Sequence, residues 1–297
     1  MAESLGHLAP KAAMFLDKSD EERIRYIRSP HWIGYPRANE ILERLEVLLE
    51  YPKSHRMPNL LIAGESNNGK TMLVTRFCNR HKPDDNPGGE AANVPILYMQ
   101  APPVPDESRF YNTILELLFA PYKPNDRPDR KQFQVLELLR AVQLKMLIID
   151  EIHHLIAGPM TKQRGFLNVI KYLGNELKIP IVAVGTADAD QAIHSDAQMA
   201  KRFEKRALPR WTNGSDYLRL LATMEHTTPL RKPSNLSDNS LADKIYAMSG
   251  GYIGDIASLV VAAAVRAIET GREKIDKKVL DDLSWTVPTD RRADLIR

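Results

Sequence analysis

Residues 64–72 have the types and spacing of a loop that binds phosphate groups. They are Gly64, Glu65, Ser66, Asn67, Asn68, Gly69, Lys70, Thr71 and Met72, and they fit the G-x-x-x-x-G-K-[ST] pattern at every fixed position. The glycines let backbone N–H groups and a helix N-terminus face phosphate oxygens. In this pattern the Lys70 ammonium neutralises the β- and γ-phosphates of ATP, and the Thr71 hydroxyl ligates Mg²⁺. The loop therefore predicts a site for ATP and Mg²⁺.

Two carboxylates follow a second apolar run and complete the chemistry of such a site. Asp150 and Glu151 end the stretch Met-Leu-Ile-Ile-Asp-Glu, which starts at Met146. Ligands of open α/β sheets bind where strands end at their carboxyl side. We expect Asp150 to hold Mg²⁺ through water and Glu151 to orient and activate the attacking water.

A hydroxyl and a group of cations are further candidates. Thr186 follows a third apolar run, where it could sense the γ-phosphate or the attacking water, or could simply cap the next helix. Residues 199–206 carry four cations, a pattern typical of a solvated helix face. In an ATPase a guanidinium from a neighbouring subunit can stabilise the transition state, so Arg202 is the first candidate and Arg206 the second.

His153 and His154 directly follow the carboxylate pair, so that residues 150–153 resemble the D-E-x-H box of helicases. That interpretation needs a second domain of similar size, for which no sequence remains. Adjacent side chains point to different faces of a regular element, which disfavours a metal site built from both histidines. We interpret them as local packing or coupling residues.

The elements that must position these residues can be read from the spacing of apolar side chains. Four short apolar runs alternate with helical patterns, as in parallel strands joined by crossover helices. The runs are Leu60–Ala63, Pro95–Met99, Met146–Ile149 and Ile181–Val184, and a helix is predicted over Arg37–Tyr51.

The last part of the chain has helical spacing only. Stripes of apolar residues end at Gly250-Gly251 and at Gly271, which are typical helix stops. The sequence thus predicts an N-terminal appendage over residues 1–30, a nucleotide-binding α/β domain over 31–211, a helical lid over 212–285 and a basic tail over 286–297.

Composition limits the classes of function. A formal charge of +3 in 297 residues excludes a polycation that binds nucleic acid through overall charge. One cysteine, Cys78, rules out an internal disulfide framework, as expected in a reducing compartment. No apolar stretch approaches the roughly 20 residues that cross a bilayer, and no secretory signal pattern opens the chain. We expect a cytoplasmic protein without membrane partners.

The order of these motifs resembles the AAA+ superfamily. Residues 32–38 (Trp-Ile-Gly-Tyr-Pro-Arg-Ala), 56–61 (Arg-Met-Pro-Asn-Leu-Leu) and the loop at 64–71 are together similar to TniB-type ATPases of bacterial transposons, relatives of TnsC. The resemblance implies an α/β AAA+ P-loop NTPase core with a five-stranded parallel sheet and a C-terminal helical lid. One departure is Asp255, which stands in the lid motif where many AAA+ proteins have a sensor arginine.

The resemblance also implies a function. Such a protein assembles on duplex DNA as a homo-oligomeric ring or helical filament and recruits or activates a transposase, with a target-selection protein as a possible further partner. By the family pattern Ile33, Tyr35 and Arg37 would border the adenine, and Arg202 would reach the neighbouring subunit's nucleotide. Candidate contacts to DNA phosphates are Arg109, Lys123, Arg127, Arg130, Lys131, Lys162 and Arg164.

Two alternatives share this fold. One is a helicase loader resembling DnaC and IstB, which would prefer single-stranded DNA and a helicase partner. The other is a nucleotide-gated scaffold that binds ATP, assembles and hydrolyses it little. If the protein is an ATPase switch, we expect hydrolysis to be slow.

Overall fold

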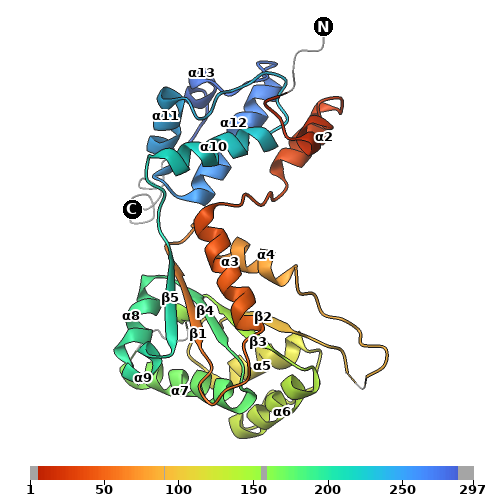
Figure 1. The fold of residues 1–297 in the computed structure, drawn as a ribbon, viewed down its shortest axis with the longest axis vertical. Helices are drawn as coiled ribbons and strands as arrows, with labels where there is room; N and C mark the ends of the chain where they lie inside the picture. The colour runs from red at the N-terminus through yellow and green to blue at the C-terminus, as the bar shows by residue number, and fades with distance from the viewer. Residues whose placement is uncertain (1–5, 90, 155–158, 287–297) are drawn as a thin grey trace. The chain divides into compact units, whose positions relative to one another are not determined.

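The computed structural model describes residues 6–89, 91–154 and 159–286, which form two compact units (Figure 1). Of the described residues, those within 36–209 form an α/β unit, and residues 6–35 join residues 210–286 in a helical unit. The sequence predicted a separate appendage over residues 1–30. In the structure this segment packs with the C-terminal helices, for a reason given below.

The α/β unit is built on one parallel sheet with the order β2-β3-β4-β1-β5. The strands are β1 (Asn59–Gly64), β2 (Ile96–Gln100), β3 (Met146–Asp150), β4 (Ile181–Gly185) and β5 (Phe203–Leu208). All residues of β3 and β4 are buried, because helices cover both faces of the sheet. This burial explains why the four apolar runs marked four of the five strands correctly.

Helices lie on both faces of the sheet (Figure 1). On one face a single apolar core joins the strands to α5, α6, α7 and α8. On the other face α3 contacts β5 and α4, and α4 contacts β1 and β4. The helical elements of this unit are α3 (Pro36–Leu49), α4 (Lys70–Cys78), α5 (Glu107–Leu117), α6 (Pro128–Ala141), the 3₁₀ turn η1 (Ile152–His154), α7 (Met160–Leu177), α8 (Ala187–Ser195) and α9 (Ala197–Ala200).

The segment around Arg202 corrects one expectation. The four cations of residues 199–206 predict a solvated helix face, but α9 ends at Ala200 and β5 begins at Phe203. β5 is an edge strand paired only with β1, with Asn59 opposite Phe203 and Gly64 opposite Leu208. An edge strand tolerates charged side chains, which is why no apolar run marked it.

The helical unit consists of α1 (Pro10–Ala13), α2 (Asp20–Arg28), α10 (Ser215–Thr227), α11 (Asn239–Ser249), α12 (Ile253–Glu269) and α13 (Lys277–Asp281). The predicted helix stops are confirmed: α11 ends at Gly250, whose φ of 63° is left-handed, and Gly271 follows α12. No single helix of the described residues is long and apolar enough to span a membrane, and α11 and α12 reach that length together only across a bend of 116°.

A buried ion pair anchors α2 in the helical unit. Arg23 is fully buried and donates two hydrogen bonds to Glu273, at 2.9 and 2.5 Å, and further bonds to the carbonyl of Pro229. The start of α2 is fixed by a capping box between Ser19 and Glu22. The ion pair acts together with the apolar side chains of α2, because Ile27 is buried in the core of the helical unit and Ile24 packs against that core.

Replacing Arg23 by alanine is expected to lower the free energy of unfolding by about 3–5 kcal/mol, because Glu273 keeps a buried charge without its main partner. Urea unfolding followed by circular dichroism measures this loss. Arg219→Ala is the control, since its ion pair with Asp216 is largely exposed and should contribute less than about 1 kcal/mol. Equal losses for the two variants would contradict the role of Arg23.

This ion pair also predicts a pH dependence. Burial alone raises the pKa of Glu273, but hydrogen bonds from Arg23 and from the Arg231 backbone outweigh burial and hold the pKa below its ordinary value. A lowered pKa in the folded state contributes stability above the unfolded pKa of about 4.3, and that contribution is lost as the pH falls through the folded value. Wild type should therefore lose unfolding free energy below about pH 4 more steeply than Glu273→Gln.

Candidate nucleotide site

The candidate residues meet at the carboxyl end of the parallel sheet. β4 lies between β1 and β3, so the ends of these three strands are neighbours. The phosphate loop follows β1, Asp150 ends β3, and Thr186 follows β4. The sequence predicts that Thr186 lies beside the carboxylate pair on a neighbouring strand, and the strand order agrees, because β4 is next to β3.

The phosphate loop has the backbone that its glycines predict. Gly69 has a φ of 80° at the N-cap of α4, a left-handed conformation that a side chain disfavours. Lys70 opens the helix, and its Nζ donates to the carbonyls of Gly64 and Glu65 at 2.9 and 2.7 Å. The Lys70 side chain therefore curls over the loop in which phosphate groups would bind.

Burial lowers the pKa of Lys70, which is only 6% exposed. The carboxylates of Glu151, Asp150 and Glu65 act in the opposite direction and favour its charged form. An ammonium placed beside these carboxylates and an anion-binding loop suits the neutralisation of phosphate charge.

Asn68 has a structural role in the loop that the sequence did not suggest. Its side chain is 2% exposed, and Nδ2 donates to the carbonyls of Leu208 and Pro209 at 2.6 and 2.9 Å. The loop is thereby tied to the end of β5. Because these carbonyls engage the Nδ2 group, we expect the backbone of Asn68 rather than its side chain to contact a nucleotide.

The Asp150 carboxylate accepts three hydrogen bonds within the site. It is 2% exposed, and Oδ2 accepts hydrogen bonds from the Thr71 hydroxyl at 2.8 Å and from the Tyr98 hydroxyl at 2.9 Å. Oδ1 accepts from the backbone N–H of Glu151 at 2.8 Å. These three donors fix the carboxylate in one orientation.

Tyr98 was not among the predicted site residues. It lies on β2 opposite Ile148, and Asp150, two residues further along β3, is on the same face of the sheet. Burial and the neighbouring Asp150 raise the pKa of Tyr98 well above its usual range, so its hydroxyl stays protonated and can donate. The only signal in the sequence was its place near the end of the second apolar run.

The Thr71 and Asp150 side chains fit a magnesium ion. Their oxygens are 2.8 Å apart, and hydroxyl and carboxylate oxygens are the donors that Mg²⁺ prefers. Bound Mg²⁺ would supply positive charge to the β- and γ-phosphate oxygens. Thr71 would be a direct ligand and Asp150 a ligand through water, as the sequence predicts.

Glu151 lies just outside the buried pair of Thr71 and Asp150. Its φ of 55° is left-handed, an unusual conformation for a non-glycine residue that is often found at functional sites. Its Oε2 is 3.2 Å from Nε2 of His153, and its side chain is 33% exposed. Burial lowers the pKa of His153, against the opposing effect of Glu151. The Glu151 carboxylate is therefore accessible to water and lies beside an imidazole whose neutral form burial favours.

The structure bears on the two interpretations of Thr186. The residue is the N-cap of α8, but its side chain makes no capping hydrogen bond. Its Oγ1 is buried and has no hydrogen-bond partner among the described residues. A buried hydroxyl in this position favours the sensing role over the capping role, and the sensing role remains a prediction.

A comparison with family models decides the family. Residues 23–213 match the model described as bacterial TniB protein. The chain belongs to the TniB family. No curated protein matches it. The match spans the whole α/β unit, including the phosphate loop and the carboxylates described above.

Solved structures confirm the AAA+ fold of this TniB-family chain. The Aeropyrum pernix ORC2 protein, in ADPNP-ADP complexes, has 16% sequence identity and a TM-score of 0.62, covering 86% of this chain and 70% of that chain. CDC6P from Pyrobaculum aerophilum has 18% identity and a TM-score of 0.59 over 86% and 68%. The A. pernix ORC1 protein in complex with DNA has 16% identity and a TM-score of 0.58 over 92% and 69%. Identities this low show a shared fold alone.

Arg202 lies far from the phosphate loop of its own subunit. It directly precedes β5, whose first residue pairs with the start of β1, whereas the loop follows the end of β1. The five steps of β1 separate the two positions by about 17 Å. The guanidinium of Arg202 donates to Oδ1 of Asn175 at 2.8 Å, and that of Arg206 pairs with Glu204. Arg202 is thus placed where it cannot serve its own phosphate loop.

The three residues predicted to border the adenine are divided between the units. Ile33 and Tyr35 belong to the helical unit, where Tyr35 packs against Trp211 with ring centroids 4.9 Å apart. Arg37 belongs to the α/β unit, where Nε donates to the Ala207 carbonyl at 2.8 Å. Their contact with adenine stays a prediction.

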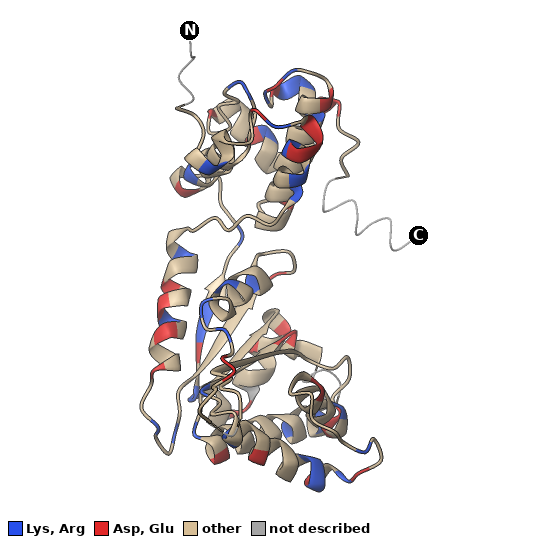
Figure 2. Ribbon diagram, turned by 90° about the vertical axis from the view of Figure 1, so that its right-hand side faces the viewer, with Lys and Arg blue, Asp and Glu red and all other residues tan. Residues whose placement is uncertain are grey.

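Most of the predicted DNA contacts have exposed side chains, but one is wrong. Lys131 is 1% exposed, and its Nζ donates to the carbonyl of Pro124 at 2.8 Å, so it is not available to a phosphate. Arg127 and Arg130 are exposed and form ion pairs with Asp129 and Asp126. Figure 2 shows acidic and basic residues interspersed along helices such as α3, in agreement with the small net charge. The exposed candidates are Arg109, Lys123, Arg127, Arg130, Lys162 and Arg164.

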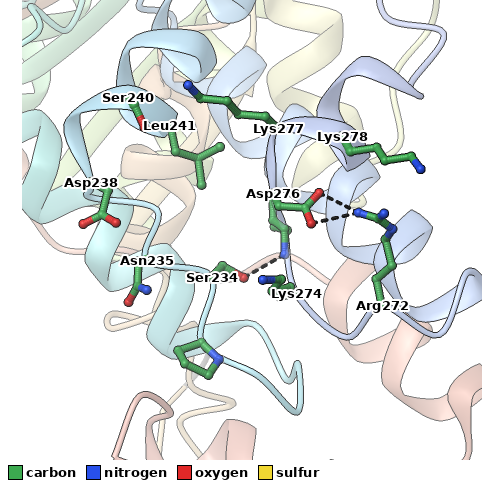
Figure 3. Close-up of a pocket in the computed structure, with 12 residues that line it drawn as sticks. Ser234, Asn235, Asp238, Ser240, Leu241, Arg272, Lys274, Asp276, Lys277 and Lys278 are labelled. Atoms are coloured by element: carbon green, nitrogen blue, oxygen red, sulfur yellow. Dashed lines mark hydrogen bonds and ion pairs between the residues drawn. The ribbon is translucent and has the colours of Figure 1, made fainter.

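The helical unit contains a separate open pocket of about 550 Å³ (Figure 3). Arg272, Lys274, Lys277 and Lys278 contribute cations to its lining. Arg272 pairs with Asp276 at 2.8 Å, and Ser234 accepts a hydrogen bond from the backbone of Ile275. The pocket is basic, but its lining holds no set of groups suited to catalysis.

Proposed function

We propose that this TniB-family protein binds ATP with Mg²⁺ and uses hydrolysis as a slow switch that controls its assembly on duplex DNA. The observation that carries the proposal is the meeting of Lys70, Thr71, Asp150 and Glu151 at one end of the sheet. These residues provide a cation for phosphate, oxygens for Mg²⁺ and a base for water. In the assembled state the protein recruits or activates a transposase, with a target-selection protein as a possible further partner.

The chemistry proposed for the site follows from its geometry. Lys70 and the loop N–H groups hold the β- and γ-phosphates, while Thr71 and Asp150 hold the magnesium ion. Glu151 accepts a proton from the attacking water, and Thr186 senses the γ-phosphate through its buried hydroxyl. Tyr98 acts through Asp150, whose orientation it fixes.

Support for DNA as the binding partner comes from the family and from the similar solved structures. The matching model is that of a bacterial TniB protein, and the similar A. pernix ORC1 protein is described in complex with DNA. In this chain the candidates for phosphate contacts are the exposed cations Arg109, Lys123, Arg127, Arg130, Lys162 and Arg164, which lie on α5, α6, α7 and the segment between α5 and α6. Such contacts are tolerant of sequence and sensitive to salt.

The test is binding of the purified protein to random-sequence duplex DNA with ATP, ADP or no nucleotide, followed by measurement of particle size. We expect DNA binding and large assemblies only with ATP, and affinity that falls steeply between low and moderate salt. Absence of DNA binding in every nucleotide state would contradict the proposal. Preference for single strands together with stimulation of a helicase would instead identify a helicase loader, and assembly without phosphate release a scaffold.

A further inference from the structure

The histidines beside Glu151 form a cluster that the proposed ATPase chemistry does not use in full. Adjacent residues of a helix or strand point to different faces, so the sequence argued against a site built from His153 and His154. In the structure both belong to the 3₁₀ turn η1, and their rings lie only 4.4 Å apart, measured between centroids. A ligating atom from each of Glu151, His153 and His154 lies within 4.8 Å of the others.

The spacing of these atoms suits a tetrahedral ion. Two ligands bound at about 2.0–2.1 Å with a tetrahedral angle are about 3.3 Å apart. The Glu151 Oε2 and His153 Nε2 atoms are 3.2 Å apart, so two of the ligand positions are already at the required separation. The third ligand atom, from His154, lies within 4.8 Å of the other two. A rotation of the His154 side chain that moves this atom by at most about 1.5 Å brings it to the ligand separation of about 3.3 Å.

Within the described part of the chain, each of the two imidazoles leaves one ring nitrogen unsatisfied. The Nδ1 atoms of His153 and His154 are both buried and have no hydrogen-bond partner among the described residues. Buried polar atoms of side chains usually have a partner, and two in adjacent residues are unusual. The charges around the His153 ring are mixed: the carboxylates of Glu151 and Asp188 favour its charged form, and His154 and the Lys70 ammonium oppose it.

We propose that Glu151, His153 and His154 bind a borderline divalent cation, with Zn²⁺ as the best match, and that the bound ion takes Glu151 away from the activation of water. Two nitrogens and one carboxylate select such a cation, whereas the oxygens of Thr71 and Asp150 select Mg²⁺. The two sites therefore discriminate between metals although they are neighbours. Water completes the coordination of the ion.

The regulatory half of this inference rests on the proposed ATPase function, but the metal site does not. A carboxylate bound to Zn²⁺ cannot accept a proton from water, so Zn²⁺ is expected to inhibit hydrolysis in the presence of excess Mg²⁺. Nucleotide binding needs Lys70 and the loop, which contribute no ligand to the cluster. Zn²⁺ should consequently trap the assembled state, as loss of the Glu151 base would.

Metal binding is tested directly with Co²⁺, whose visible absorption reports tetrahedral coordination. The full chain, with excess Mg²⁺ and no nucleotide, should show this absorption at one equivalent of Co²⁺ and lose it when Zn²⁺ is added. His153→Ala and His154→Ala should each weaken Co²⁺ binding at least about tenfold, the lower end of effects seen for groups that support a metal site. The control is His81→Ala, because His81 pairs with Glu46 at 2.7 Å elsewhere in the same unit.

Absence of the Co²⁺ absorption in the wild-type chain, or its persistence in His154→Ala, would overturn the proposal and leave His153 as a residue that only orients Glu151. Circular dichroism shows whether each variant is folded. Turnover of wild type should fall on addition of Zn²⁺, and the residual turnover of His154→Ala should resist it. If the protein binds Co²⁺ but releases no phosphate from ATP, the metal site is supported and the proposed ATPase function is contradicted.

Discussion

Replacement of Glu151 by glutamine is expected to lower ATP turnover by about 10²- to 10⁴-fold while ATP binding and assembly persist. Glutamine keeps the size of the side chain, but its amide cannot accept a proton from water. Glu151 contributes no ligand to the pair formed by Thr71 and Asp150, whose oxygens lie 2.8 Å apart. The phosphate and magnesium contacts should therefore survive, and the assembled state should accumulate.

Lys70→Ala is the matched comparison, because it removes the buried ammonium at the phosphate loop and leaves Glu151 in place. This variant should lose nucleotide binding and, with it, assembly. Titration with a fluorescent ATP analogue, phosphate release and particle size are measured on both variants. If Glu151→Gln proves as defective in assembly as Lys70→Ala, then Glu151 is not the base, and another residue of the site must be.

The parts of the fold predicted from sequence are those in which one local pattern determines the structure. A strand buried on both faces is a run of apolar residues, so the runs at Leu60, Met146 and Ile181 identified their strands. β5 had no such run because an edge strand can place Glu204 and Arg206 in a shared ion pair. Its existence followed from the family resemblance and its position from the structure.

The same limit applies to the candidate site. The phosphate loop is continuous in sequence, and its Gly-Lys-Thr pattern was sufficient to predict Lys70 and Thr71. The donor that Tyr98 provides to Asp150 depends on which strand lies beside β3, and the role of Asn68 depends on the position of β5. The spacing of residues along the chain predicts neither contact, because each contact joins segments that only the fold brings together.

His153 and His154 show a different limit. The rule that adjacent side chains diverge assumes a regular helix or strand, and the chain follows neither after Asp150. A left-handed Glu151 and a short 3₁₀ turn bring the two rings together. The departure from regular geometry is located at the end of β3, where Glu151, the proposed catalytic base, is also placed.

Arg202→Ala is expected to lower turnover by about 10³-fold or more without emptying the nucleotide site, if Arg202 stabilises the transition state in a neighbouring subunit. The position of Arg202 before β5, at the opposite end of β1 from the phosphate loop, is consistent with action between subunits. Phosphate release and binding of a fluorescent ATP analogue separate the two effects. Unchanged turnover would transfer the role to Arg206 or to another residue.

Mixing two inactive variants decides whether Arg202 acts between subunits. In a mixed assembly, a subunit carrying Arg202→Ala still has its own Lys70 and Glu151, and a Glu151→Gln neighbour still has Arg202. Sites formed at that junction are complete if the guanidinium comes from the neighbour, so the mixture should recover part of the wild-type turnover. If Arg202 acts within its own subunit, every site lacks one group and no recovery occurs. Mixing Arg202→Ala with Arg202→Ala/Glu151→Gln is the control, because both variants are expected to assemble and no subunit then supplies Arg202.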